Sequence, residues 1–315
     1  MKRRLLIFTA AFCLMVHAQT TDIKEYVEPL LQTTWGQDIP YNLSCPIKTN
    51  SNGDSQHCRV GCVACAMGQV MNYHQYPEVG IGSWTDMFNS SATANFGETH
   101  YDWANMLDSY ADGYTEEQTT AVSTLLYHCG VAVNMIYGLE SSSTFTAFAN
   151  NMVSALTRFF GYETEGLQSV NRSKYTKEAW LQMIYENLSA GQPIIYSGNS
   201  ATMGGHTWVV DGYDREGRVH MNWGWLGQAN GYYDIDLNDT QQDFNQSQSM
   251  VIGIRKPVAN AVQSSQFIVH SSEFTVHSSE FTVYDLLGRK VDDSTLHQKL
   301  PKGIYICNGQ KFIVK

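Results

Sequence analysis

The sequence predicts an α+β fold, with a helical N-terminal lobe and an antiparallel β-meander C-terminal lobe. Apolar residues recur at helical spacing through residues 63–190, whereas short apolar runs broken by Gly, Asn and Asp follow residue 193. The composition is 43% hydrophobic and 16% charged, enough apolar material for a sizeable core. Helices first and strands second leave a cleft between two lobes, where we expect the chemistry.

Four helices and five strands are expected in order. The first helix follows Gly61 and stops at Tyr76-Pro77, and the last opens with a capping threonine, Thr176. The other helices are expected over residues 116–136, 145–160 and 176–190. The strands are expected over residues 194–196, 206–213, 218–223, 232–237 and 250–254.

Charge and targeting signals point to an exported protein. Basic residues number 20 against 30 acidic ones, so a nucleic-acid backbone is an improbable partner. Residues 2–4 are basic, residues 5–16 are apolar, and residues 16–18 resemble a small-residue cleavage site. We therefore predict a signal peptide over residues 1–18. A membrane anchor is the weaker alternative because the apolar run is too short to span a bilayer.

The cluster of Cys58, Cys62 and Cys65 has four interpretations. A zinc site would normally show a second pair of ligands, and a redox pair would sit in a βαβ pattern. The others are a single nucleophile and buried structural thiols. The helical pattern after Gly61 favours the nucleophile, since it places Cys62 at a helix N-terminus, where the positive dipole end is expected to lower the thiol pKa.

A histidine and an asparagine complete a candidate constellation. His206 follows Gly204-Gly205 and lies 144 residues after Cys62, within the ~130–150 residues typical of papain-like Cys and His. Asn222 is expected to accept the second imidazole N–H, with neighbouring indoles shielding that bond. The order Cys, His, Asn is that of thiol proteases.

These motifs jointly resemble the streptopain family of secreted bacterial cysteine proteases. The resemblance covers about residues 20–256. It is carried by the nucleophile helix (residues 61–74), the histidine strand (204–212), the tryptophan-rich loop (222–225), the segment 35–42 and the turn 137–143.

The resemblance implies a papain-like, two-lobed peptidase domain over residues 19–256. It implies Cys62 as nucleophile, His206 as general base and acid, and Gln37 as a side-chain oxyanion donor. Ser143 and Gly205 would touch the substrate main chain. Asn222 is the expected third catalytic residue, although Trp223 and Trp225, also expected to contact substrate, are alternatives for positioning the imidazole.

Two departures from the family leave open how activity is controlled. Relatives usually carry an inhibitory propeptide, whereas here the predicted signal peptide is followed almost directly by the peptidase domain. Cys65 stands where a small hydroxyl or apolar residue is expected. It is expected either to pair with Cys62 or Cys58 or to remain a buried thiol.

The C-terminal residues form a separate region. Residues 263–283 contain three copies of a seven-residue repeat, so residues 257–280 are interpreted as a linker. Residues 281–315 resemble a shortened type IX secretion sorting tail, which would engage secretion machinery and route the protein through the periplasm to the surface or medium. A small β appendage packed on the enzyme is the alternative.

The favoured function is therefore a secreted cysteine endopeptidase acting on proteins or peptides. Another thiol acyl-transfer enzyme, such as a peptidoglycan amidase or a transglutaminase-like enzyme, is the alternative within enzymes. A catalytically silent surface-binding module is the alternative outside them. No motif implies a metal or an organic cofactor.

Overall fold

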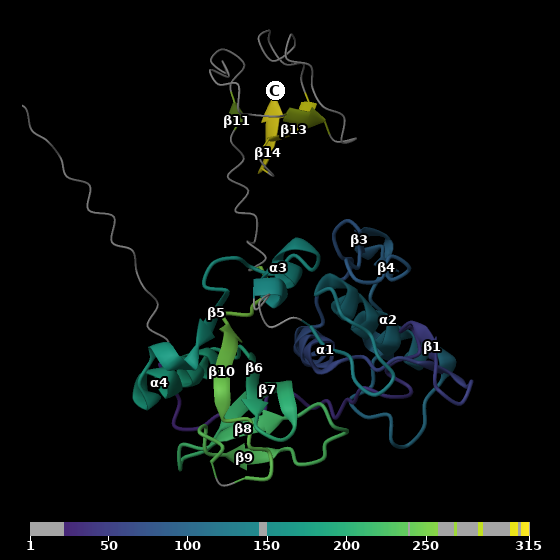
Figure 1. Ribbon diagram of the computed structural model, residues 1–315. Coiled ribbons are helices and arrows are strands. Elements are labelled where there is room, and N and C mark those ends of the chain that lie inside the picture. Colours follow the sequence, from purple (N-terminus) through teal and green to yellow (C-terminus); the bar gives the residue numbers. More distant parts are fainter. Residues whose placement is uncertain are drawn as a thin grey trace, which may run out of the picture. The chain divides into compact units, whose positions relative to one another are not determined.

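A computed structural model describes residues 22–144, 150–238 and 240–257, together with four strands of the C-terminal region (Figure 1). The chain divides into two compact units, residues 1–256 and 257–315. The predicted signal peptide lies outside the described residues. Within those residues, no helix is long and apolar enough to cross a membrane.

Residues 145–149, the predicted start of the third helix, lie outside the described residues. The four predicted helices are present. They are α1 (Cys62–His74), α2 (Glu116–Ala132), α3 (Asn150–Arg158) and α4 (Lys177–Ser189). Thr176 caps α4 as expected, and Thr115 forms a capping box with Gln118 at the start of α2. Helix α2 ends before the predicted residue 136, since the backbone turns left-handed at Asn134. Short 3₁₀ turns cover Phe96–Glu98, Trp103–Asn105 and Arg172–Lys174.

The main sheet has six antiparallel strands in the order β5-β10-β6-β7-β8-β9. Its middle strands form the predicted meander, but β10 returns to pair with β6, and β5 was not predicted. The bounds are β5 (Gln168–Asn171), β6 (Ile194–Ser200), β7 (Gly204–Tyr213), β8 (Val219–Asn222), β9 (Gly231–Tyr233) and β10 (Gln246–Ile252).

Two buried clusters cover the two faces of this sheet. On β6 and β7, Ile195 and Val209 pack with α1 and α2, whereas Ile194, Trp208 and Val210 pack with α4. Adjacent residues of a strand point to opposite faces, which explains the division. The sheet therefore lies between α4 on one side and α1 with α2 on the other (Figure 1).

Smaller elements complete each unit. The segment after residue 22 is tied to the sheet, because Val27 bridges Tyr213 and the Leu31 N–H donates to Asp211. Two hairpins pair β1 (Ile47–Thr49) with β2 (Ser55–His57) and β3 (Trp84–Thr85) with β4 (Thr93–Ala94). The second unit holds a sheet in the order β11-β14-β13-β12, built of β11 (Ile268–Val269), β12 (Val283–Asp285), β13 (Gly303–Cys307) and β14 (Gln310–Val314).

Candidate active site

Cys62 is the first residue of α1, as the sequence predicted. It is a free, partly exposed thiol. Gly61 before it has φ +90°, a conformation that glycine adopts without strain. A side chain at Gly61 would also collide with the thioether of Met135, 2.7 Å from an ideal Cβ. A glycine is thus required for the chain to enter α1 at this angle.

The electrostatics of Cys62 differ from the expectation of a lowered pKa. Burial raises the pKa of the thiol, and hydrogen bonds from Thr207 and from the Val63 N–H oppose this effect. Burial is the largest of these effects, and it favours the neutral form of the thiol. The position at the helix N-terminus was predicted correctly, but the prediction of a low pKa neglected the desolvation of the sulfur.

His206 is the third residue of β7 and is buried. Its Nε2 is 2.9 Å from the Trp223 carbonyl oxygen. A carbonyl only accepts, so Nε2 carries the proton and Nδ1 has the free lone pair of a base. Burial lowers the pKa of His206 to about 4, and the bond to Trp223 partly opposes this. The imidazole is therefore neutral at pH 7.

Asn222 does not have the expected hydrogen bond to the imidazole. Its Nδ2 donates to the Thr33 carbonyl at 2.7 Å, and its Oδ1 accepts from the Gly224 N–H at 3.2 Å. The acceptor for His206 is instead the carbonyl of the next residue. Asn222 therefore shapes the loop that presents this carbonyl, which corrects its predicted role as the direct partner of the base.

The two predicted tryptophans have different positions. Trp225 is partly exposed and stacks on His206 with ring centroids 4.7 Å apart, so it is available to substrate. Trp223 is fully buried between Trp208 and Trp225. The prediction that Trp223 contacts substrate is therefore wrong for its side chain, which has no accessible surface.

Gln37 is brought to the start of α1 by main-chain bonds. Its carbonyl accepts from the Val60 N–H at 3.0 Å, two residues before Cys62. The preceding Gly36 carbonyl accepts from the Cys65 thiol at 3.5 Å. The side chain of Gln37 is partly exposed, as a donor to a substrate oxygen must be.

Ser143 and Gly205 both lie at the surface. Ser143 exchanges two main-chain hydrogen bonds with Ile136, of 2.8 and 3.1 Å, and Ser142 donates from its hydroxyl to the Arg59 carbonyl at 2.6 Å. This fastens the predicted substrate-binding turn beside Gly61. Gly205 is exposed at the start of β7, next to His206.

Cys65 is a free, buried thiol that packs under the site. Besides its bond to Gly36, its sulfur lies 3.1 Å from the position that a Cβ on Gly224 would take. Cys45 and Cys58 are also free and buried. Of the alternatives left open by the sequence, the structure has Cys65 as a reduced thiol that joins α1 to the two loops.

Comparison with known proteins identifies the group to which these residues belong. The model of the Peptidase C10 family matches residues 35–233. The chain belongs to the Peptidase C10 family. Streptopain of Streptococcus pyogenes serotype M28 is 34% identical over 265 residues, which cover 76% of this chain and 65% of streptopain. The chain therefore spans slightly less than two thirds of the length of that relative.

Two further proteins are similar to this chain. The thiol protease/hemagglutinin PrtT of Porphyromonas gingivalis is 31% identical over 262 residues, 76% of this chain and 29% of that protein. The structure of active wild-type interpain A, a cysteine protease of Prevotella intermedia, has a TM-score of 0.65 and 40% identity, covering 73% of this chain and 95% of interpain A. The predicted α+β, papain-like fold and the family resemblance are thereby confirmed.

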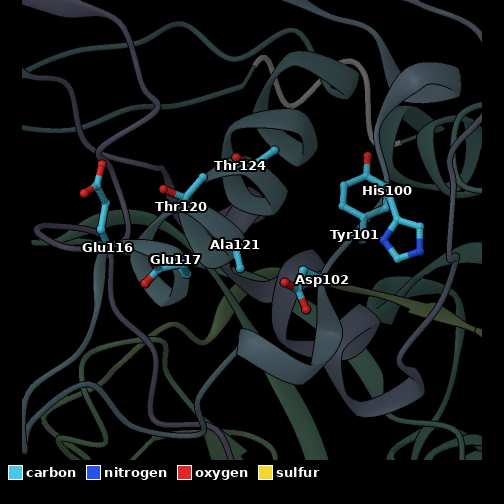
Figure 2. Close-up of a pocket in the computed structure, with 8 residues that line it drawn as sticks. All are labelled: His100, Tyr101, Asp102, Glu116, Glu117, Thr120, Ala121 and Thr124. Atoms are coloured by element: carbon cyan, nitrogen blue, oxygen red, sulfur yellow. The ribbon is translucent and has the colours of Figure 1, made fainter.

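A hollow of about 510 Å³ lies away from these residues. Figure 2 shows it between α2 and the segment around Tyr101, with the carboxylates of Asp102, Glu116 and Glu117 on its walls. None of the candidate site residues lines it. Tyr101 has its hydroxyl 3.0 Å from His128, so this buried group is already paired. We assign no chemistry to this hollow.

Proposed function

We propose that the protein is a cysteine endopeptidase. The observation that carries this proposal is the placement of Cys62 as the first residue of α1, together with a His206 imidazole that is held by a main-chain carbonyl through Nε2. A thiol next to a base that is itself oriented by a third group is the arrangement of a nucleophilic enzyme. Membership of the C10 family supports the same conclusion.

The geometry suggests the order of steps. His206 Nδ1 takes the proton of the Cys62 thiol, and the sulfur attacks the carbonyl carbon of the substrate. The resulting oxyanion is held by the Cys62 N–H, unpaired at the helix start, and by the Gln37 amide. Nδ1–H then protonates the leaving amine. A water molecule, deprotonated by the same nitrogen, hydrolyses the thioester and restores the thiol.

The substrate would lie along the exposed main chain at Ser143 and Gly205. Ser143 lies on the turn that is fastened beside Gly61, and Gly205 lies directly before His206. An extended peptide needs main-chain partners of this kind. Trp225 would form a wall over the imidazole. We therefore propose protein or peptide substrates, bound mainly through their backbone.

Export is part of the proposal. The pattern of residues 1–18 supports a signal peptide, and that of residues 281–315 supports a sorting tail, with residues 257–280 as the linker between this tail and the peptidase domain over residues 19–256. Together they would carry the enzyme through the periplasm to the cell surface or medium.

The decisive test compares Cys62→Ala with Cys65→Ala on casein and on purified cell wall. We expect wild type and Cys65→Ala to cleave casein, and Cys62→Ala to be inactive while still folded, since the change removes one small atom. An epoxide thiol inhibitor should label Cys62 alone. Cleavage of cell wall but not of casein would indicate an amidase. If the wild type, with its Cys62 thiol intact, cleaves neither substrate, a binding module is indicated.

A further inference from the structure

Leu226, which directly follows the tryptophan-rich loop, has a backbone conformation that leucine rarely adopts. Its φ is +57°, in the left-handed region that favours glycine and is strained for other residues. Among the described residues, Leu237 is the other leucine with a positive φ, and it is fully buried in the cluster that packs with α4, which compensates for the strain. Leu226 is 56% exposed and belongs to neither buried cluster. Packing in the core therefore does not explain a leucine at this position.

The side chain of Leu226 lies directly on Gly36. A Cβ added at Gly36 would be 2.6 Å from Leu226 Cδ2, so only a glycine permits this close approach. The Leu226 N–H donates to the Trp35 carbonyl oxygen at 3.1 Å, which ties the backbone of the leucine to the same segment. One side of the leucine is thus held against the main chain, and the other side is left as a fixed apolar surface.

Leu226 lies between two parts of the candidate active site. Trp225, directly before it, stacks on His206 with ring centroids 4.7 Å apart. Gly36, beneath it, directly precedes Gln37, whose carbonyl is bonded to the residues that lead into α1. In the proposed reaction His206 protonates the leaving amine and Gln37 holds the oxyanion. The leucine therefore connects the group that serves the leaving amine with the group that serves the carbonyl oxygen.

The two halves of a bound peptide need different surfaces. Under the proposed function, the acyl half lies along the main chain at Ser143 and Gly205. The other half carries the leaving amine and must pass His206, which protonates that amine. Beyond this imidazole the next surfaces are the stacked indole of Trp225 and the exposed side of Leu226. Both are apolar.

We propose that Leu226 is a specificity-determining residue that selects a large aliphatic side chain on the residue directly after the scissile bond. The proposal rests on the proposed function, since it concerns the substrate of the same site. An aliphatic side chain placed against the leucine and the Trp225 indole removes apolar surface from water. A glycine at position 226 would suit the backbone better but would offer no such surface. Strained residues of this kind are typical of functional sites.

The test compares peptides that differ only in the residue after the cut. Mass spectrometry of a casein digest made by the wild type locates a cleaved bond. Internally quenched peptides then reproduce this site with either Leu or Ala directly after the bond, and mass spectrometry checks that each is cut there. The acyl half is the same in both peptides, so a difference in kcat/KM arises in the acylation step. The measured quantity is the Leu-to-Ala ratio of kcat/KM.

Two variants remove the aliphatic side chain without adding backbone strain. Glycine and asparagine both tolerate the left-handed conformation, so the variants are Leu226→Gly and Leu226→Asn. The matched control is Ile81→Ala, because Ile81 is an aliphatic residue of similar exposure, 53%. The Ile81 N–H donates to the Phe159 carbonyl, in a part of the chain that holds no candidate site residue.

We expect the wild type to have a Leu-to-Ala ratio of about ten, the effect of partly burying the additional carbons of one aliphatic side chain. In Leu226→Gly and Leu226→Asn the ratio should fall toward one, because the apolar surface is lost. Ile81→Ala should keep the wild-type ratio. A general loss of stability or activity would lower kcat/KM for both peptides and leave their ratio unchanged.

A wild-type ratio near one, or a ratio retained in both Leu226 variants, would overturn this inference and leave the proposed function intact. An equal fall in Ile81→Ala would also overturn it, since the effect would not then belong to position 226. If Leu226→Gly does not fold, Leu226→Asn decides. If the wild type cleaves no casein, the proposed function itself fails and the inference fails with it, so the two failures are distinguishable.

Discussion

At the scale of single residues, burial acts on both the candidate nucleophile and the candidate base. Burial raises the pKa of Cys62 and lowers that of His206 to about 4, so each group resists its charged form. Groups that donate to the sulfur or to the oxyanion then carry much of the stabilisation of the transition state.

The oxyanion donor gives the first prediction. Gln37→Ala should lower kcat by on the order of 10²–10³, the usual loss for one such donor, with little change in KM. Steady-state kinetics on a fluorogenic peptide would measure both constants. The matched control is Asp38→Ala, which alters the exposed neighbour of Gln37 and its ion pair with Arg59. A change in KM alone would make Gln37 a binding residue.

The sequence identified the two reacting residues but not the partner of the base. Cys62 and His206 have recognisable surroundings, a glycine before a helical pattern and a glycine pair before a strand. The Trp223 carbonyl has no such sequence signature, because every residue has a carbonyl. The sequence analysis therefore assigned the role of partner to the Asn222 side chain, one residue earlier.

At the scale of elements, the backbone is constrained where α1 begins. Gly61 combines a positive φ with the closeness of Met135, and the turn that ends at Ser143 is fastened to the same place through Arg59. The nucleophile is thus positioned by the junction of a helix and a turn.

Alanine substitutions at Gly53 and Gly61 distinguish the cost of backbone strain from the cost of a side-chain collision. Gly61 and Gly53 both have φ +90°, but a Cβ at Gly53 meets nothing within 4 Å. Gly53→Ala should cost about 1 kcal/mol from backbone strain alone. Gly61→Ala should cost more and reduce kcat, because the Met135 thioether must also move. Chemical denaturation and kinetics would measure both effects, and equal losses of stability would show that the contact is unimportant.

The strands show what periodicity predicts and what it does not. Ile194 to Tyr196 and the long β7 were predicted because their apolar runs are dense and bounded by Gly or Pro. Strand β5 was missed since Gln168–Asn171 has one buried residue, Val170, and an edge strand needs little more. The return of β10 to β6 depends on long-range pairing, which local sequence does not encode.

At the scale of the whole molecule, two buried histidines and the half-buried His74 link stability to pH. Burial lowers the pKa of His74, His128 and His206 to about 4 each, and the Lys256 charge adds to the effect at His74. The unfolded chain binds these protons near the ordinary value of 6.5. Between these values the unfolded state holds more protons, so stability is greatest above pH 6.5 and falls toward pH 4.

We therefore predict a fall in the free energy of unfolding between pH 6.5 and 4, of up to a few kcal/mol for each histidine. Buried Asp86 and Asp211, whose pKa values are raised by burial, act in the opposite direction. Urea titrations at several pH values would measure the slope. His128→Gln should flatten it, whereas a substitution of exposed His100 should not; equal slopes would contradict the prediction.

The tail provides the last prediction. Deletion of residues 283–315 should leave an active enzyme retained in the periplasm, because the sorting signal is lost while residues 1–256 form a compact unit of their own. Fractionation of cells followed by a casein assay would locate the activity. An unfolded or inactive product would show instead that the tail is part of the fold, as a β appendage.

The main-chain partner of His206 also affects how the enzyme tolerates mutation. A base oriented by a side chain loses that partner through a single codon change. Here the peptide unit at Trp223 supplies the oxygen, and every replacement at that position would still supply one. A mutation that displaces this carbonyl must instead change the conformation of the loop. Asn222 and Asn230 hold that loop, and Asn230 Oδ1 accepts from the Trp223 N–H at 3.0 Å. In variants of this gene, the carbonyl that accepts from His206 cannot be removed by a substitution, whereas the conformation of the loop that carries it can be changed.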